Sequence, residues 1–281
     1  MILNKRSFLV LTPIFLFLAL GFFYRFDIDK KIEIKVLGMK SAPQENRKPQ
    51  DIDINGRKKV KYFQDYTIVL VGDSMTEKLG NSDELRMYLK KYYTDKTFEV
   101  LNYGFGSTNI LSVQERLEKT TFHGRDFRPI LDIAFDLILI ESFGNNPLSE
   151  MPLDQGLKKQ TEALDKIMEA TRRENPKAKI AFVATIAPNR YSYGKKLVDL
   201  TPEKRAQWAD ERTQYIKNHI DYANAHQIPL INIYQKSLKG NEGGSLEYLS
   251  SDDYIHPSPN GVYFISEEIA KGIFEQKLLT L

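Results

Sequence analysis

The sequence predicts an α/β fold in which a parallel sheet of five strands is covered by helices on both faces. Three observations support this. From residue 66 onward, short apolar runs recur that are typical of buried strands. The segments between them carry apolar residues at helical spacing, and the two kinds of segment alternate. Alternation of this kind favours parallel strands joined by right-handed helical crossovers.

The strands are expected where apolar residues run together. The first, Ile68 to Val71, consists of four apolar residues, three of them β-branched, and it stops at the turn signal Gly72-Asp73. The other four strands are expected at residues 98–102, 137–140, 180–184 and 228–233. Helices are expected at 77–93, 109–119, 155–173, 201–225 and from 260 to about 273. Thr201 and Pro202 suit the N-cap and first position of the fourth helix.

The composition suits one large domain with appendages. Of the 281 residues, 42% are hydrophobic and 27% are charged, so a sizeable core is available. The net charge of +3 is too small to indicate nucleic-acid binding. The absence of cysteine excludes disulfides and thiolate metal sites. It does not exclude an extracytoplasmic location, because a domain of this size can be stable without disulfides.

An apolar run at residues 8–24 follows Lys5 and Arg6 and is just long enough to span a membrane. A cleaved signal peptide would end in small residues, whereas this run ends in bulky aromatic ones. We therefore predict an uncleaved signal anchor over residues 1–26, in preference to a signal peptide or a buried core helix. The basic residues before the run put the N-terminus in the cytoplasm and the domain outside, although basic residues at 25, 30 and 31 oppose that orientation.

Residues 27–64 are interpreted as a stalk between the anchor and a catalytic domain at 65–281. Alternating residues at 31–37 would allow a short strand. Residues 41–61 are polar, contain two prolines and carry a basic run at 57–61. This composition favours a solvated linker over a binding patch.

Ser74 follows the first strand at its carboxyl end, where open α/β sheets bind ligands. A serine there is a candidate nucleophile if the chain also supplies a base and an oxyanion hole. The base is sought among four histidines, and His256 lies in a loop before the last helix, at the same sheet edge. Asp253 could hold its imidazole, with Asp252 as the rival carboxylate. The other histidines are less well placed: His123, His219 and His226.

Two loops at this edge offer oxyanion donors. Residues 102–108 follow the second strand and contain Gly104 and Gly106, which allow a backbone N–H to approach a substrate closely. Residues 141–147 follow the third strand and contain Asn145 and Asn146, whose amides are donors. Either loop alone could be a plain turn. The convergence of four such segments on one edge favours a catalytic site.

Together the four segments resemble the SGNH, or GDSL-type, hydrolases. Gly72-Asp73-Ser74 is similar to the nucleophile block of that family and 102–108 to its glycine block. Residues 144–146 match the start of its Gly-x-Asn-Asp block, and 253–256 match its Asp-x-x-His block. The resemblance covers residues 65–277 with the blocks in the right order. It implies a flavodoxin-like three-layer sandwich of strand order 2-1-3-4-5, and catalysis of ester chemistry without metal or cofactor.

The resemblance also implies roles for individual residues. Ser74, Asp253 and His256 correspond to the catalytic triad. The oxyanion hole would comprise the backbone N–H groups of Ser74 and Gly106 and the side chain of Asn146, with Gly104 and Asn145 as alternatives. Two departures bear on this choice, because the glycine block is one residue short and proline replaces the usual aspartate after Asn146.

The function expected is a membrane-anchored, extracytoplasmic serine esterase that cleaves short acyl esters, such as acetyl esters on a carbohydrate. The alternatives are an O-acyltransferase of cell-wall or exopolysaccharide glycans, a lysophospholipase, and a catalytically silent glycan-binding relative. The expected partners are an acylated small molecule, glycan or lipid, and the membrane. Residues 188–200, after the fourth strand, are either a substrate-contacting loop or a solvated one.

Overall fold

A parallel sheet of five strands forms the centre of the domain in the computed structural model, which describes residues 48–54 and 56–280. The strands lie in the order β4 (Phe98–Gly104), β3 (Tyr66–Gly72), β7 (Leu137–Glu141), β8 (Lys179–Ala184) and β9 (Leu230–Asn232). Numbered along the chain, this order is 2-1-3-4-5. All four neighbouring pairs are parallel, so every strand ends at the same edge.

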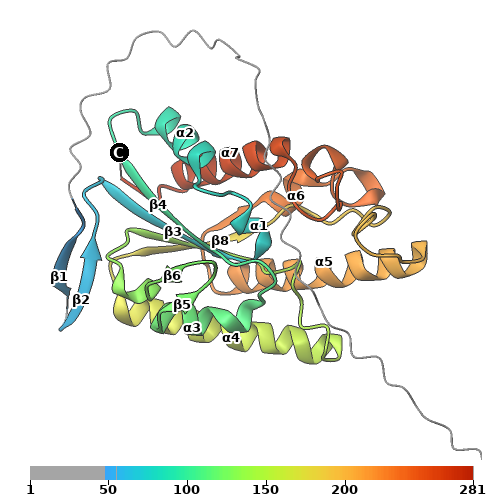
Figure 1. Ribbon diagram of the computed structural model, residues 1–281, viewed down its shortest axis with the longest axis horizontal. Coiled ribbons are helices and arrows are strands. Elements are labelled where there is room, and N and C mark those ends of the chain that lie inside the picture. Colours follow the sequence, from blue (N-terminus) through green and yellow to red (C-terminus); the bar gives the residue numbers. More distant parts are fainter. Residues whose placement is uncertain (1–47, 55, 281) are drawn as a thin grey trace, which may run out of the picture. The chain divides into compact units, whose positions relative to one another are not determined.

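Helices cover the two faces of the sheet and make three layers (Figure 1). One face packs against α2 (Asp83–Tyr92) and α7 (Pro259–Glu275). The other face packs against α3 (Val113–Glu118), α4 (Leu153–Glu174) and α5 (Pro202–Ala225). Successive residues of β3 point to opposite faces, so Ile68 joins the first core and Val69 the second. A strand covered on both faces has to be apolar throughout, as β3 is. The parallel sheet with helices on both faces confirms the predicted α/β class.

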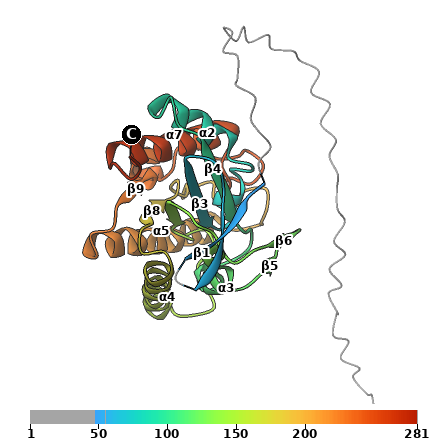
Figure 2. The same cartoon turned by 90° about the vertical axis from the view of Figure 1, so that its left-hand side faces the viewer.

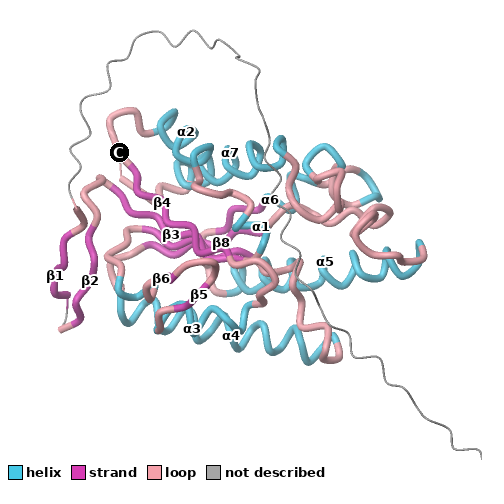
Figure 3. Tube along the Cα trace, in the orientation of Figure 1, coloured by secondary structure: helices cyan, strands magenta, loops and turns pink. Residues whose placement is uncertain are grey.

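Shorter elements complete the described chain (Figure 3). Two hairpins pair β1 (Gln50–Ile54) with β2 (Arg57–Lys61) and β5 (Thr121–Phe122) with β6 (Asp126–Phe127). The short α-helices are α1 (Ser74–Glu77) and α6 (Ile233–Ser237). The 3₁₀ turns are η1 (Ile110–Ser112), η2 (Ile130–Asp132), η3 (Gly240–Glu242) and η4 (Leu246–Tyr248).

The structure corrects two predicted elements. The helix expected at 77–93 is divided into α1 and α2, because Gly80 and Ser82 adopt left-handed φ values of 54° and 61°. The strand expected at 228–233 is only three residues long, because Asn232 already caps the next helix. Its side chain accepts a hydrogen bond from the backbone N–H of Gln235 at 3.0 Å.

The end of the predicted stalk also differs from expectation, because residues 50–61 form the β1–β2 hairpin rather than a solvated linker. The Lys59 side chain is buried, and its Nζ donates to Glu174 O at 2.5 Å and to Asn175 Oδ1 at 2.6 Å. Arg57 pairs with Asp132 at 2.7 Å. A lysine can be buried in this way because its stem is apolar and its ammonium finds acceptors.

The predicted membrane anchor, residues 1–26, and the first part of the predicted stalk, 27–47, lie outside the described residues and stay predictions. Within residues 48–54 and 56–280, no helix is both long enough and apolar enough to cross a bilayer.

The hairpin yields a stability prediction. Lys59→Ala should lower the free energy of unfolding by about 1–3 kcal/mol, because it removes a buried donor and leaves the acceptors on Glu174 and Asn175 without it. Lys58→Ala is the matched control, since Lys58 is exposed in the same strand. Urea unfolding measures both variants. Equal stability of the two variants would contradict the packing of the β1–β2 hairpin through Lys59 against Glu174 and Asn175.

Candidate active site

Ser74 is presented by a tight turn between β3 and the single helical turn α1. The turn depends on two neighbours of Ser74. A Cβ at Gly72 would come within 1.9 Å of Thr76 Oγ1, so only glycine fits there. Asp73 is fully buried and caps α1 by accepting a hydrogen bond from Met75 N at 2.8 Å. Ser74 is therefore held, half-buried, at the carboxyl edge of the sheet.

A buried arginine joins this turn to the next strand. Arg116 of α3 is 1% exposed, and its Nη1 donates to Gly72 O and to Tyr103 O, both at 2.8 Å. Its Nη2 donates to the hydroxyls of Thr108 and Ser112. Burial lowers the pKa of Arg116 to about 10, against the opposing effect of nearby carboxylates, so the guanidinium stays charged at neutral pH. One side chain thus fixes the ends of β3 and β4 together.

Two buried carboxyl groups lie beneath Ser74. Glu141, at the end of β7, accepts hydrogen bonds from Ser142 Oγ at 2.7 Å and Phe143 N at 3.0 Å. Its other oxygen is 3.3 Å from Asp73 N. Burial and then the charge of Asp73 raise the pKa of Glu141 well above its usual range. We therefore take Glu141 as the protonated member of the pair and Asp73 as the carboxylate.

The candidate base and its carboxylate are hydrogen-bonded. His256 Nδ1 lies 2.6 Å from Asp253 Oδ2, while Asp253 Oδ1 accepts the backbone N–H groups of Ile255 and His256. Burial alone would raise the pKa of Asp253, but the hydrogen bond with His256 and the two backbone donors bring it below its usual value. The rival Asp252 is exposed. With Nδ1 occupied, the ring has Nε2 left for a substrate or a nucleophile.

The two asparagines of the 141–147 loop point to different partners. Asn146 Nδ2 donates to Asp73 Oδ2 at 2.9 Å, so this amide lies beside the nucleophile turn. Asn145 Oδ1 accepts from the hydroxyl of Tyr193 at 3.1 Å. Tyr193 belongs to the loop 188–200, is 2% exposed, and also accepts from Arg212 Nε. That loop therefore packs against the asparagine loop at Tyr193, whereas its neighbour Tyr191 is 61% exposed.

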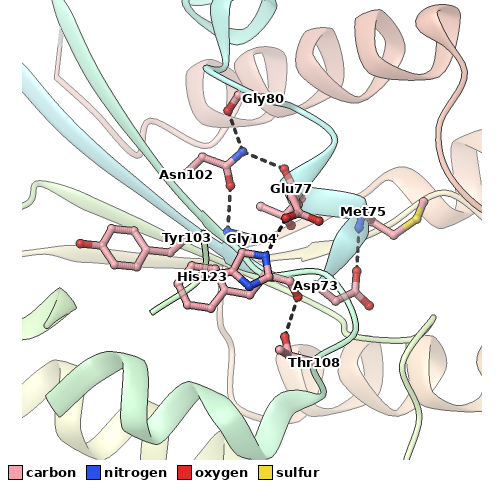
Figure 4. Close-up of polar contacts among 12 residues, drawn as sticks. Asp73, Met75, Glu77, Gly80, Asn102, Tyr103, Gly104, Thr108 and His123 are labelled. Atoms are coloured by element: carbon pink, nitrogen blue, oxygen red, sulfur yellow. Dashed lines mark hydrogen bonds and ion pairs between the residues drawn. The ribbon is translucent and has the colours of Figure 1, made fainter. Parts of the chain in front are cut away.

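The glycine loop is tied to α1 by Asn102, as Figure 4 shows. Asn102 Nδ2 donates to Thr76 O and Gly80 O, and its Oδ1 accepts the N–H of Gly104 at 2.8 Å. The N–H of Gly104 is thus engaged. By contrast, the N–H of Gly106 has no acceptor among the residues that the structure describes.

Three of the loops around the site contain a left-handed residue other than glycine. Ser107 of the glycine loop, Phe143 of the asparagine loop and Tyr254 between Asp253 and His256 have φ values of 59°, 54° and 57°. Residues other than glycine rarely adopt this conformation, and where they do they often lie at functional sites.

The predicted site residues thus converge on one edge, although one contact is not formed. Burial raises the pKa of Asp73, against the opposing effects of its hydrogen bonds from Asn146 and Met75 and of His256, which lies near the nucleophile turn. Ser74 Oγ and His256 Nε2 make no hydrogen bond to each other in the described chain. Within that same part of the chain, no group of three or more His, Cys, Asp or Glu side chains is placed to hold a metal ion.

A comparison with protein families then identifies the domain. The model of the GDSL-like lipase/acylhydrolase family matches residues 70–262, which include the turn, both loops and the Asp253–His256 pair. The chain belongs to this family. It is therefore a GDSL hydrolase, an enzyme that acts on ester bonds. A comparison with curated proteins gives no match.

Solved structures share the fold of this GDSL hydrolase at low sequence identity. A lipase/acylhydrolase from Enterococcus faecalis is 18% identical over 75% of this chain and 96% of its own, with a TM-score of 0.53. A GDSL-like lipase from Bacteroides thetaiotaomicron VPI-5482 is 15% identical, with coverages of 76% and 89% and a TM-score of 0.53. The acetyl xylan esterase AlAXEase is 12% identical, with coverages of 74% and 99% and a TM-score of 0.52.

Sequence reasoning did not find three features of the GDSL site. Arg116 was not singled out within the predicted helix 109–119, and Glu141 was considered only as part of the 141–147 loop. His123, set aside as a base, pairs with Glu77 Oε1 at 2.7 Å and stacks on Phe105. The one available signal was a glutamate directly after a fully apolar strand, a position that forces the carboxyl group into the buried edge of the sheet.

Glu141→Gln should change stability in a pH-dependent way. Because folding raises the pKa of Glu141, the folded state takes up a proton, and stability falls as pH rises above about 4.5, its ordinary value. Glutamine has nearly the same shape and does not titrate. We expect the stability of Glu141→Gln relative to wild type to be greater at pH 8 than at pH 5 in urea unfolding.

The control for this experiment is Glu169→Gln, at an exposed glutamate on α4. A stability difference between Glu141→Gln and wild type that does not vary with pH would mean that Glu141 is ionised in the folded enzyme.

Proposed function

We propose that this GDSL hydrolase is a serine esterase that cleaves short acyl esters, in particular acetyl esters of a carbohydrate, through an acyl-enzyme on Ser74. The hydrogen bond between Asp253 and His256 carries this proposal. It fixes the imidazole tautomer whose Nε2 accepts a proton, in a loop at the edge where Ser74 lies. The absence of a direct contact between Ser74 and His256 is compatible with it, because such hydrogen bonds are often looser without substrate.

The proposed reaction has two half-reactions. His256 Nε2 takes the proton of Ser74 Oγ while the oxygen bonds to the ester carbonyl carbon, which gives a tetrahedral oxyanion. As the carbon–oxygen bond to the carrier breaks, His256 returns the proton to the departing alcohol. Water, activated by the same histidine, then attacks the acyl-enzyme and releases the acid and Ser74.

Three donors are proposed for the oxyanion: the backbone N–H groups of Ser74 and Gly106, and Nδ2 of Asn146. Gly106 is preferred to Gly104 because the N–H of Gly104 already donates to Asn102. Asn146 is preferred to Asn145 because its amide is held beside the nucleophile turn by Asp73, and Nδ2 keeps a second hydrogen for substrate.

A short acyl group and a carbohydrate carrier are supported by the fold that the chain shares with the acetyl xylan esterase AlAXEase, an enzyme named for acetyl esters of a glycan.

The triad should behave as one unit. Ser74→Ala and His256→Ala should each remove almost all hydrolysis of p-nitrophenyl acetate, and the double variant should be little worse than either. Asp253→Asn should lower kcat about 10²–10⁴-fold, whereas Asp252→Asn, at the exposed neighbour, is the control. Steady-state kinetics measures all five variants. Additive losses in the double variant would mean that Ser74 and His256 are not partners.

Asn146→Ala should lower kcat by about 10²–10³-fold with little change in KM, because it removes a donor that acts on the transition state. Asn145→Ala is the matched control, since that amide contacts Tyr193 instead. If Asn145→Ala proves the more damaging, the adjacent amide supplies the donor.

The acyl preference can be read from a chain-length series. We expect kcat/KM to fall from p-nitrophenyl acetate to the octanoate and the palmitate, because the proposed substrate carries a short acyl group and longer chains would gain no specific contacts. A rise with chain length would favour a lysophospholipase. Acylated product formed on adding an acceptor sugar would identify a transferase.

A further inference from the structure

A polar groove runs from the proposed oxyanion loop along the exposed edge of the sheet. It has a volume of about 570 Å³, and its floor is β4, from Glu99 to Gly104. Because β4 is the last strand of the sheet, its outer side is not covered by another strand. At about 3.3 Å per residue, the stretch from Glu99 to Gly104 is roughly 17 Å long. The groove is therefore an elongated site.

The inner end of the groove lies next to the proposed catalytic residues. Glu77 borders it and is three residues after Ser74 in α1, so both side chains project from the same side of that turn. A Cβ built on Gly106 would come within 2.5 Å of Glu77 Oε2, so this carboxylate adjoins the proposed oxyanion donor. His123 holds the carboxylate at 2.7 Å. Figure 4 shows Glu77 and His123 beside Asn102 and Gly104.

Two charged side chains along the groove, Glu99 and Arg125, form no ion pair with the described residues. Glu99 is half-buried, and its carboxyl group makes no hydrogen bond or ion pair with any residue the structure describes. Burial raises the pKa of this carboxyl group, against the opposing effect of Arg86. In the part of the chain described, Arg125 of the β5–β6 hairpin makes no ion pair either. Its guanidinium lies 4.4 Å from the ring centre of Phe127. Figure 2 shows this hairpin at one side of the domain.

We propose that this groove binds the carrier of the ester, and that the carrier is a neutral, hydroxyl-rich chain such as a linear oligosaccharide. Hydroxyls donate to carboxylates and accept from guanidinium groups, so one ligand can satisfy both Glu99 and Arg125. Tyr62 and Phe127 also line the groove and would supply apolar contacts for sugar C–H groups. The proposal rests on the esterase function above, because it extends that site away from Ser74.

The charges of the groove argue against other carriers. Acidic Glu77, Asp83 and Glu99 and basic Arg86 and Arg125 all line the groove, and Arg86 pairs with Asp83 at 2.6 Å. A polyanion would meet three carboxylates, and a lipid chain would leave charged groups desolvated without partners. A neutral polyhydroxyl chain has neither cost.

Binding by the full-length Ser74→Ala protein tests this proposal without requiring turnover. The probes are xylopentaose, cellopentaose and chitopentaose, with lysophosphatidylcholine as the lipid, each titrated by calorimetry. At least one oligosaccharide should bind. Adding Glu99→Gln and Arg125→Ala together should weaken its Kd about tenfold or more, because two hydrogen bonds to charged groups are lost. Asp126→Asn is the control, at an exposed residue of the same hairpin that does not line the groove.

The binding and activity measurements distinguish failure of the carrier proposal from failure of the esterase function. The carrier proposal is overturned if none of the oligosaccharides binds, if the double change leaves the Kd within about twofold, or if it weakens lysophosphatidylcholine instead. A wild-type enzyme that hydrolyses no ester, combined with oligosaccharide binding that depends on Glu99 and Arg125, would refute the esterase function and leave the groove as a glycan site.

Discussion

The arrangement of the site depends on one buried charge, the Arg116 guanidinium. It donates to Gly72 O at the end of β3 and to Tyr103 O near the end of β4, and so fixes the distance between the nucleophile turn and the glycine loop. Neighbouring parallel strands alone would leave their following loops free to move apart. An unpaired buried charge is costly, but here carbonyls and hydroxyls surround it, and the rings of Phe105 and Phe143 flank it.

Asp73 and Glu141, two buried carboxyl groups near Arg116, differ in their expected charge. Asp73, which we take as the carboxylate, caps α1 and accepts from the amide of Asn146. Burial and the charge of Asp73 raise the pKa of Glu141, so Glu141 adds no second negative charge beneath Ser74. Two ionised carboxylates at this depth would oppose the negative charge that develops on an ester oxygen. The left-handed residues Ser107 and Phe143 lie in the loops that this network holds, where buried hydrogen bonds can balance their strain.

The sequence predicted best those features that depend on short stretches of chain. The run Ile68 to Val71 is apolar because both of its faces are covered, and Asp253 reaches His256 within one turn. Features that depend on distant partners could not be predicted. The sequence around Lys59 predicts a solvated side chain, because its acceptors on Glu174 and Asn175 are distant in sequence and only the fold brings them close. Arg116 likewise occupies a helix position that periodicity alone leaves to solvent, and its acceptors come from three other segments.

The break in the helix predicted at 77–93 likewise involves a distant partner. The backbone turns left-handed at Gly80 and Ser82, and the Asn102 side chain of β4 donates to Thr76 O and Gly80 O across this break. The early end of α1 leaves Glu77 adjoining both the glycine loop and the groove along β4. A local pattern was therefore overridden by a contact from the neighbouring strand.

The central claim is that Ser74 becomes acylated because His256 removes its proton. Intact-protein mass spectrometry after treatment with a fluorophosphonate measures this directly, with peptide mapping to locate the adduct. The account predicts one adduct per wild-type chain, located on Ser74, and almost none on His256→Ala at the same exposure. An adduct on another residue, or undiminished labelling of Ser74 in His256→Ala, would contradict it.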